Sequence, residues 1–339
     1  MRVALDAQLT VGTATGIGEY VRGLAAALRG RGTDVVELRD EGLDPWRFDR
    51  RILWDQLLLP RRARTSGAGL LHCTAGTMPL DAGMPIVVTV HDLAWHEAQA
   101  HAPAYARYYF GAFSLRRYRR AARIVVDSNF SRERLLRLLD AEAARVQVVY
   151  PGVAADFCNL ERTTGDRRTI LAVGTVERRK NLAVLIRALP SLPGARLLAL
   201  GPHTPYAQEC AELAQRLGVS DRVEMPGYVS RADLLARYRS CAVVAVPSLY
   251  EGFGYAAAQA LCAGAPCVVS DRSSLPEIAR DEARIVSADD EAAWIAALAA
   301  ALGGENDQRA ASVRAGAIAR FAWEASAAQM EALYALVDR

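Results

Sequence analysis

The sequence predicts an α/β protein of two domains, each with a parallel sheet covered by helices on both faces. Short apolar runs alternate with helical stretches along the chain, and fully apolar strands are typical of parallel sheets buried on both sides. The runs are residues 86–90, 124–126, 146–150, 170–173, 197–200, 243–246 and 267–269. The segment 152–168 has no clear periodicity and holds the turn-like Thr163-Thr164-Gly165-Asp166. It divides two halves of similar length, which predicts a linker.

Composition fits two ordinary globular domains. The 339 residues are 52% apolar and 23% charged, enough to bury two cores. The chain has no run of 18 apolar residues, and Met1-Arg2-Val3 leads straight into a strand-like segment, so we expect a cytoplasmic protein. Its six cysteines form no Cys-x-x-Cys pair and mostly lie beside apolar residues. We therefore expect them to be reduced and structural.

The first candidate site is a turn that carries the single lysine of the chain. Of 41 basic residues only Lys180 is a lysine, and it follows the apolar run 169–173 through Gly174 and Thr175. At a strand-to-helix turn, a compact ammonium can meet a phosphate as a point charge. The alternative is that a GC-rich genome favours arginine codons and that this lysine survived by chance.

The second candidate site is a glycine turn that leads into a helix. Glu251-Gly252-Phe253-Gly254 follows an apolar strand, and the run 255–261 is a strong helix former. The N–H groups of Gly254 and Tyr255 would lie at the positive end of the helix dipole, which favours an anion. Glu251 and Gln259 lie eight residues apart, a little over two helical turns. The alternative is a buried alanine-rich helix after an ordinary loop.

A third glycine turn lies near the start of the chain. Residues 2–6 form an apolar strand, and Gly16-Ile17-Gly18 leads into a helix that continues to about Leu28. The third glycine of the dinucleotide-binding fingerprint is missing, so we do not expect a nicotinamide cofactor.

Taken together, these residues resemble the retaining glycosyltransferases of family 4, which have the GT-B fold. The matching stretches run in family order from Gly16 to Glu324: residues 16–18, 87–93, 127–131, 148–153, 227–229, 274–277 and 321–324. The pattern looks most like the bacterial O-antigen mannosyltransferases. The resemblance implies two Rossmann-like domains facing across a cleft. Residues 1–152 would bind the acceptor, residues 166–322 would bind the nucleotide sugar, and a helix at about 323–339 would cross back onto the first domain.

The resemblance implies a role for each motif residue. Glu251 corresponds to the residue that contacts the donor sugar, and Gln259 to the one that holds the ribose hydroxyls. The family has glutamate at both positions, so Gln259 leaves three outcomes open: weaker nucleotide affinity, altered ribose preference, or a silent enzyme. The family commonly has an arginine where this chain has Thr175. Arg178 or Arg179 can replace that charge, and the sequence does not choose between them.

The remaining expected site residues come from several strand ends. His91 corresponds to the family's histidine at a strand end of the first domain, which faces the reacting sugar. Tyr228 and Val229 are expected near the nucleotide base, while Gly16 and Gly18 are expected to contact the donor. His72 follows another apolar segment, and we expect it to line the acceptor cleft.

The chemistry that the resemblance implies needs charge stabilisation at the leaving group. When the bond between sugar and diphosphate breaks, the phosphate gains negative charge. Lys180 with Arg179 would balance it from one side, and the helix start at Gly254 and Tyr255 from the other. We therefore expect no metal. The sequence has no Asp-x-Asp motif, which is typical of the metal-dependent transferases. Asp289-Asp290 lies at an expected helix start and is interpreted as a helix cap. A double displacement needs a carboxylate nucleophile, so we favour front-face displacement.

The implied function is a metal-independent retaining hexosyltransferase. The donor would be a nucleotide sugar, with GDP-mannose favoured, and the acceptor a glycan or a lipid-linked molecule. Two alternatives stay open: a transferase that uses a dTDP- or UDP-sugar, and a catalytically silent partner protein that only binds a sugar nucleotide. We expect no cofactor beyond the donor. We expect no nucleic-acid partner, because the net charge is only +3 and no recognition motif is present.

Positive charge concentrates in the first half of the chain. Residues 1–150 carry 21 arginines and 16 acidic residues, a net charge of +5, while the remainder has a net charge of −2. The excess lies in 47–64 and 107–123, where aromatic residues are interleaved. Such a face suits an anionic membrane surface or a lipid-linked diphosphate, which would make the protein peripheral at the inner face of the membrane. The alternative is a solvated helix face whose aromatic rings pack inward.

Overall fold

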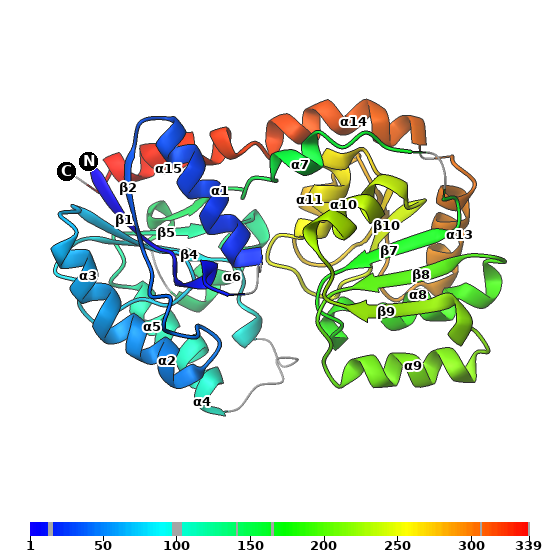
Figure 1. Ribbon diagram of the computed structural model, residues 1–339, viewed down its shortest axis with the longest axis horizontal. Helices are drawn as coiled ribbons and strands as arrows, with labels where there is room; N and C mark the ends of the chain where they lie inside the picture. The colour runs from blue at the N-terminus through cyan, green and yellow to red at the C-terminus, as the bar shows by residue number, and fades with distance from the viewer. Residues whose placement is uncertain (13–15, 97–103, 140–141, 164–165, 306, 338–339) are drawn as a thin grey trace. The chain divides into compact units, whose positions relative to one another are not determined.

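The computed structural model describes the chain except residues 13–15, 97–103, 140–141, 164–165, 306 and 338–339. The chain divides into two compact units. Unit 1 comprises Met1–Ala154 and Phe321–Arg339, and unit 2 comprises Ala155–Arg320. In each unit a parallel sheet has helices on both sides (Figure 1), which confirms the predicted α/β class. Two residues of the expected turn at 163–166 lie outside the described residues.

The sheet of unit 1 has six parallel strands in the order β2-β1-β3-β4-β5-β6. Their bounds are β1 Arg2–Asp6, β2 Asp34–Leu38, β3 Leu70–Cys73, β4 Ile86–Val90, β5 Arg123–Val126 and β6 Val146–Val148. The strand order reverses between β1 and β3, which lie side by side although β2 separates them in sequence. In sheets of this kind, ligands bind beyond the carboxyl ends of the strands at such a reversal.

The sheet of unit 2 also has six parallel strands, in the order β12-β11-β10-β7-β8-β9. Their bounds are β7 Thr169–Val173, β8 Arg196–Leu200, β9 Val223–Gly227, β10 Val243–Val246, β11 Cys267–Ser270 and β12 Arg284–Val286. Here the order reverses between β7 and β10, which pair directly. The two segments that follow these strands carry Lys180 and Glu251.

The helices of unit 1 are largely short, with two stretches of π-helical geometry. Their bounds are α1 Gly16–Gly30, α2 Phe48–Leu53, η2 Trp54–Leu58, α3 Leu59–Thr65, α4 Ala104–Ala106, η4 Arg107–Phe113, α5 Ser114–Tyr118, α6 Asn129–Leu139 and α15 Trp323–Ala335. The 3₁₀ turns η1 Gln8–Thr10, η3 Ala94–His96 and η5 Ala143–Arg145 complete the described elements. One face of α1 is buried, and its apolar residues recur at helical spacing.

The C-terminal helix α15 packs on α1 within unit 1. Trp323 lies so close to two glycines that a Cβ added at Gly23 or Gly152 would fall 2.1 or 2.3 Å from its side chain. Further along the helix, Glu331 accepts a hydrogen bond from Arg31 at 2.8 Å. Gly23 and Gly152 therefore leave the space that Trp323 needs for α15 to pack on α1.

The helices of unit 2 surround its sheet in the same way. Their bounds are α7 Ala155–Cys158, η6 Arg178–Lys180, α8 Leu182–Ala188, η7 Leu189–Ser191, α9 Tyr206–Arg216, η8 Ser220–Arg222, α10 Arg231–Ser240, α11 Tyr255–Ala263, α12 Leu275–Ala279, α13 Glu291–Leu302 and α14 Asp307–Arg320. Six of the nine residues of α11 are buried, and four of these six are alanines.

The seven apolar runs predicted six of the eight described interior strands and one of the four described edge strands. β4 and β10 match the expected bounds, and the other five runs lie on β5, β6, β7, β8 and β11 with shifts of up to two residues. β2, β9 and β12 were not predicted, and all three are edge strands. Their residues are partly exposed and include charged side chains and Pro226. An edge strand needs only one apolar face, so its sequence carries a weaker signal.

Candidate functional site

The reversal in the sheet of unit 2 brings Lys180 to Glu251. Lys180 lies at the end of η6, after β7, and its Nζ donates to Glu251 Oε1 at 2.6 Å. Gly174, with φ of +129°, makes room for the lysine side chain: a Cβ there would lie 3.3 Å from Lys180 Cε. Two residues that sequence reasoning placed in separate turns therefore form one ion pair.

Glu251 is almost fully buried and is hydrogen-bonded by five described residues, of which Lys180, Arg179 and Ser248 contact its side chain. Ser248 Oγ donates to Glu251 Oε1 at 2.8 Å, and the backbone N–H of Glu251 donates to Ser273 Oγ at 2.8 Å. Burial by itself would raise the pKa of Glu251, but Lys180 and Arg179 outweigh it and the pKa is lowered. The carboxylate is thus ionised although it is buried.

Arg179 is the second cation of this cluster. Its Nη1 lies 3.3 Å from Glu251 Oε2 and donates to the Tyr250 carbonyl at 3.1 Å, while its Nη2 lies 2.9 Å from Glu177 Oε1. Arg178 instead pairs with Glu209 of α9 at 2.6 Å. Of the two arginines left open by the sequence, the structure brings Arg179 to Glu251. Thr175 is half-buried in the same turn and offers no charge.

The glycine turn after Glu251 leads into α11 as predicted. Gly254 is the N-cap of α11 with φ of +98°, a conformation that favours glycine. A Cβ there would also fall 2.8 Å from Leu275 Cδ2. Ser274 Oγ bonds to the carbonyls of Glu251 and Phe253 at 3.0 and 2.9 Å and so fixes the turn. The positive end of a nine-residue helix therefore begins within four residues of Glu251.

Gln259 lies in the middle of α11 and is half-buried. Its Oε1 accepts a hydrogen bond from the buried Tyr238 hydroxyl at 3.1 Å. Tyr238 uses one of the two acceptor sites of Oε1, and the amide nitrogen can donate to a ligand. A glutamate at this position would offer an acceptor instead.

The residues expected near the base and in the first glycine turn have fewer close contacts in the structure than Lys180 and Glu251. Tyr228 and Val229 follow β9, where Gly227 has φ of +85°, and Tyr228 is more than half exposed. Gly16 and Gly18 form the first turn of α1. A Cβ at Gly16 would meet no atom within 4 Å, so that position does not require glycine for space. Their roles stay predictions.

In unit 1, His91 lies at the end of β4 with both ring nitrogens in hydrogen bonds. Its Nδ1 lies 2.7 Å from Asp127 Oδ2, and its Nε2 lies 2.7 Å from the Thr74 carbonyl oxygen. The Tyr20 ring meets the imidazole edge-on, with 4.8 Å between centroids. The predicted contact of His91 with a sugar stays a prediction, and neither ring nitrogen is available for it in this arrangement.

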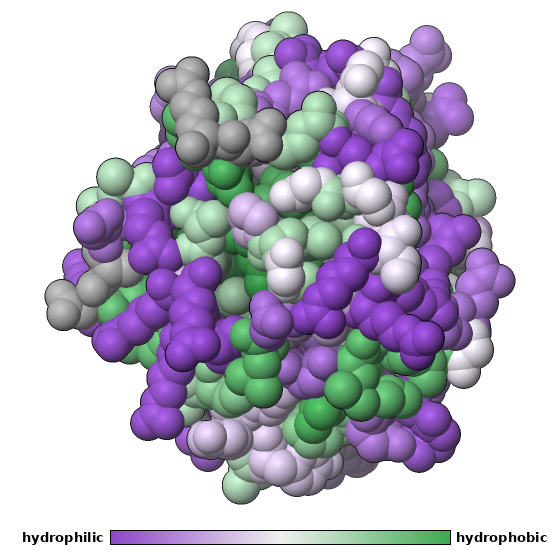
Figure 2. All heavy atoms as spheres, turned by 90° about the vertical axis from the view of Figure 1, so that its left-hand side faces the viewer, coloured by the Kyte–Doolittle hydropathy of each residue, from purple (hydrophilic) through white to green (hydrophobic). Residues whose placement is uncertain are grey.

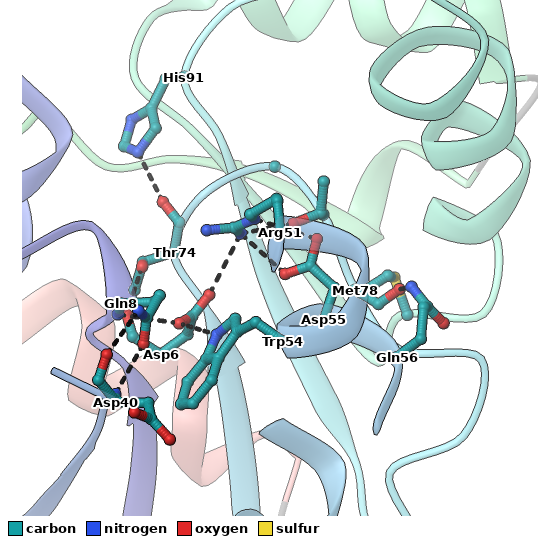
Figure 3. Close-up of polar contacts among 12 residues, drawn as sticks. Asp6, Gln8, Asp40, Arg51, Trp54, Asp55, Gln56, Thr74, Met78 and His91 are labelled. Carbon is teal, nitrogen blue, oxygen red and sulfur yellow. Dashed lines mark hydrogen bonds and ion pairs between the residues drawn. The ribbon is translucent and has the colours of Figure 1, made fainter. Parts of the chain in front are cut away.

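A buried polar network that the sequence did not reveal lies next to His91 (Figure 3). Asp6 at the end of β1 accepts from Trp54 Nε1 at 2.9 Å and lies 3.5 Å from Arg51 Nη2. Arg51 also donates to Asp55 at 3.1 Å and to Thr77 at 2.7 Å. Arg51 and Asp55 are four residues apart on a helical stretch, and this spacing is the sequence signal from which their pairing could have been predicted.

The expectation that His72 lines an acceptor cleft is wrong. His72 belongs to β3 and is fully buried. Its Nδ1 bonds to the Tyr334 hydroxyl of α15 and its Nε2 to Thr89 Oγ1, both at 2.7 Å. Burial lowers the pKa of His72 to about 3, so the ring is neutral. Its role is to join β3 to α15.

The arginine-rich segments of unit 1 place aromatic residues both inside and outside. Trp54, Tyr109 and Tyr118 are buried, which agrees with inward packing. Trp46, Tyr105 and Tyr108 are more than half exposed, as is Leu57. On the face of unit 1 that lies at the left-hand side of Figure 1, Figure 2 shows hydrophobic residues set among hydrophilic ones.

Within the described residues, no group of three or more His, Cys, Asp or Glu side chains is arranged to hold a metal ion. Among the helices of the same residues, none is both long and apolar enough to cross a membrane.

Two known families match the chain, one in each half. Glycosyltransferase Family 4 matches residues 14–157, and Glycosyl transferases group 1 matches residues 160–317. The chain belongs to glycosyltransferase family 4. A D-inositol 3-phosphate glycosyltransferase of Mycobacterium sp. strain KMS is 34% identical over 174 residues, 48% of this chain and 40% of the relative. One of Xylanimonas cellulosilytica is 36% identical over 236 residues, 62% of this chain and 56% of the relative. The chain thus spans about half the length of these curated relatives.

Solved structures support the GT-B fold for this family 4 member. The Anabaena protein HepE in complex with UDP-glucose superposes with a TM-score of 0.77 at 16% identity, and 99% of each chain is covered. Sucrose-phosphate synthase from Thermosynechococcus elongatus gives 0.73 at 23% identity, with 98% of each chain covered. The fold is GT-B, as expected. The curated relatives named above are not O-antigen mannosyltransferases, so the narrower resemblance is not supported by them.

Proposed function

We propose that this protein transfers a hexosyl group from a nucleotide sugar to an acceptor hydroxyl with retention of anomeric configuration. The observation that carries the proposal is the cluster of Lys180, Arg179 and Glu251 at the reversal in the sheet of unit 2, beside the start of α11. Two cations and a helix N-terminus suit a diphosphate. A buried, ionised carboxylate suits the hydroxyls of the attached sugar.

The proposed step forms a bond between the acceptor oxygen and the anomeric carbon while the bond to the diphosphate breaks. Lys180 and Arg179 stabilise the negative charge that grows on the leaving phosphate. The acceptor's proton passes to the departing phosphate oxygen, so the products are the glycoside and the nucleoside diphosphate. This front-face route needs no carboxylate nucleophile. Glu251 suits that role poorly, because its charge is already matched by two cations.

The proposed transferase needs no metal ion. In the metal-dependent alternative, a divalent cation would bridge the two phosphates of the donor and share the leaving group's charge. Here Lys180 and Arg179 can supply that positive charge.

The donor is proposed as a hexose nucleotide, and its base is left to experiment. The O-antigen resemblance favours GDP-mannose, while the HepE complex with UDP-glucose supports a uridine donor, and dTDP-sugars complete the set. Two kinds of acceptor are candidates. One is a glycan or lipid-linked molecule, and the other is an inositol phosphate, for which the curated relatives are named. We propose that unit 2 binds the donor and unit 1 the acceptor.

A donor panel tests this proposal. GDP-mannose, UDP-glucose, UDP-N-acetylglucosamine and dTDP-glucose are each incubated with the protein, with and without D-inositol 3-phosphate or a lipid-linked glycan. Mass spectrometry then follows the glycoside and the nucleoside diphosphate. Transfer, or slow hydrolysis of one donor, supports the enzyme. Tight binding of a donor by calorimetry without any turnover over the whole panel would instead support the silent binding protein, for which Gln259 is the favouring observation.

We also propose that unit 1 meets an anionic membrane surface. Arg50, Arg61, Arg107 and Arg116 are exposed, and so are Trp46, Leu57, Tyr105 and Tyr108 in or beside the same segments of the chain. Arginines attract anionic headgroups, and aromatic rings suit the interface. Co-sedimentation with phosphatidylglycerol vesicles should exceed that with phosphatidylcholine vesicles and fall as salt is raised. Equal recovery on both vesicles would contradict this contact.

A further inference from the structure

His91 is clamped from both sides. The Thr74 carbonyl oxygen can only accept a hydrogen bond, so Nε2 at 2.7 Å must carry a hydrogen (Figure 3). An ionised Asp127 carboxylate can also only accept, so Nδ1 at 2.7 Å must carry the second hydrogen. An imidazole with hydrogens on both nitrogens is positively charged.

Strand register explains why this pair forms. β4 and β5 are neighbours, and their last residues, Val90 and Val126, are paired in the sheet. His91 and Asp127 are the next residues of the two strands, so they meet at the same edge. Asp127 is buried, and its other oxygen, Oδ1, has no hydrogen-bond partner among the described residues. The imidazole is therefore the main stabilising partner of this carboxylate.

The surroundings of His91 favour the charged ring. Burial disfavours an imidazolium, but the adjacent Asp127 carboxylate, with help from Asp92, outweighs it and raises the pKa of His91. Burial also raises the pKa of the Asp127 carboxyl, and the charge and hydrogen bond of His91 oppose that shift. The other titratable groups that face the ring are the neutral His72 on β3 and the Tyr20 phenol on α1. Burial raises the pKa of Tyr20 far above neutrality, so this phenol is also uncharged.

We propose that Asp127 is a positioning residue that keeps His91 as an imidazolium with both N–H groups used inside the protein. His91 then offers a ligand a fixed positive charge in place of a ring nitrogen. It also ties the loop after β3 to the end of β5. The catalytic consequence, which rests on the proposed transfer reaction, is that His91 acts by charge and not as a general acid or base.

The first test measures the proton on His91 directly. Long-range ¹H–¹⁵N spectra of the histidine rings are recorded from pH 5 to 9, with His91→Gln used to assign the signals. Both His91 nitrogens should remain protonated well above pH 6.5. In Asp127→Asn, which keeps the shape and removes the charge, the pKa of His91 should fall by about 1 to 3 units. Asp92→Asn is the matched control, because this nearby carboxylate has no bond to the ring in the structure, and its effect should be smaller.

Two spectral outcomes would overturn the proposal. One is a neutral His91 ring at pH 7 in the parent protein, which would place the proton on Asp127. The other is an unchanged pKa of His91 in Asp127→Asn. Thermal melts of each variant check that the fold is retained, and both signals can be read without any substrate.

The second test concerns transfer. With a donor that is turned over, the kcat of the parent should show no step from loss of a proton by His91 between pH 6 and 8. In Asp127→Asn, kcat should fall about tenfold as pH rises through the new pKa of His91, with KM for the donor nearly constant. A pH profile identical to that of the parent would overturn the role of the charge. If no donor is turned over, the proposed function fails, while the spectra still decide the role of Asp127.

Discussion

Lys180 Nζ lies 2.6 Å from Glu251 Oε1, so an ion pair joins the two candidate turns of unit 2. Arg179 extends the pair to Glu177, and the cluster then holds two cations and two carboxylates. A diphosphate must compete with these carboxylates for both cations.

Lys180→Ala should lower kcat/KM for transfer by an amount equal to about 2 to 4 kcal/mol of transition-state stabilisation, by analogy with the loss of one electrostatic donor. Arg178→Ala is the matched control, since this neighbour pairs with Glu209 instead of Glu251. Steady-state kinetics of both variants give the comparison. Activity of Lys180→Ala within about twofold of the parent would show that Lys180 does not stabilise the leaving diphosphate.

Glu251→Gln should separate nucleotide binding from transfer. Removing the carboxylate charge frees Lys180 and Arg179, so a nucleoside diphosphate should bind more tightly, by about 1 kcal/mol. Transfer should nevertheless fall, because the sugar loses a charged acceptor. Calorimetry and kinetics measure the two effects, with Glu177→Gln as the control that leaves Lys180 paired. Weaker diphosphate binding by Glu251→Gln would show that the carboxylate does not compete.

Removing metal ions should leave turnover largely intact. Lys180 and the start of α11 are proposed to hold the diphosphate without a cation. The measurement is initial rate with and without EDTA, followed by addition of magnesium or manganese. Complete loss with EDTA that either metal restores would overturn the metal-independent mechanism.

Gln259→Glu should tighten binding of a ribonucleotide by about 1 kcal/mol, more than it helps the deoxyribonucleotide. Glutamate offers a charged acceptor to the ribose hydroxyls, while one oxygen can still accept from Tyr238. The gain is limited by repulsion from the diphosphate. Calorimetry with ribo and deoxyribo forms of one nucleotide gives the answer, and Tyr238→Phe tests whether the tyrosine orients the amide. Equal effects on both forms would mean that residue 259 does not contact the distinguishing hydroxyl.

His72 should make the protein less stable as pH falls. The folded-state pKa is lowered to about 3 by burial, so between pH 6.5 and 3 the unfolded chain binds the extra proton. From pH 7 to pH 5 this costs about 2 kcal/mol of unfolding free energy. His72→Gln should be less stable at pH 7 yet lack this loss. Because other buried groups also titrate, including Asp55 with a pKa raised to about 6 by burial, the difference between parent and variant is the quantity to compare. An equal loss in both proteins would refute the prediction.

Much of the fold and part of the candidate site could be predicted from the chain. Apolar runs identified the interior strands, because strands covered on both faces are apolar throughout. The glycine turn at Gly254 could be located because its positive φ and the close Leu275 side chain both require a residue without Cβ. Lys180 stood out because it is the single lysine.

Contacts between distant segments could not be predicted in the same way. The sequence by itself determined the α/β class, the interior strands and the two turns that carry Lys180 and Glu251, because these depend on periodicity and backbone preference over a few residues. Only the tertiary structure decided that Arg179 and not Arg178 reaches Glu251, that His72 is buried against α15, and that Asp127 holds His91. The physical reason is that such pairings depend on strand order and register, which join residues tens to hundreds of positions apart.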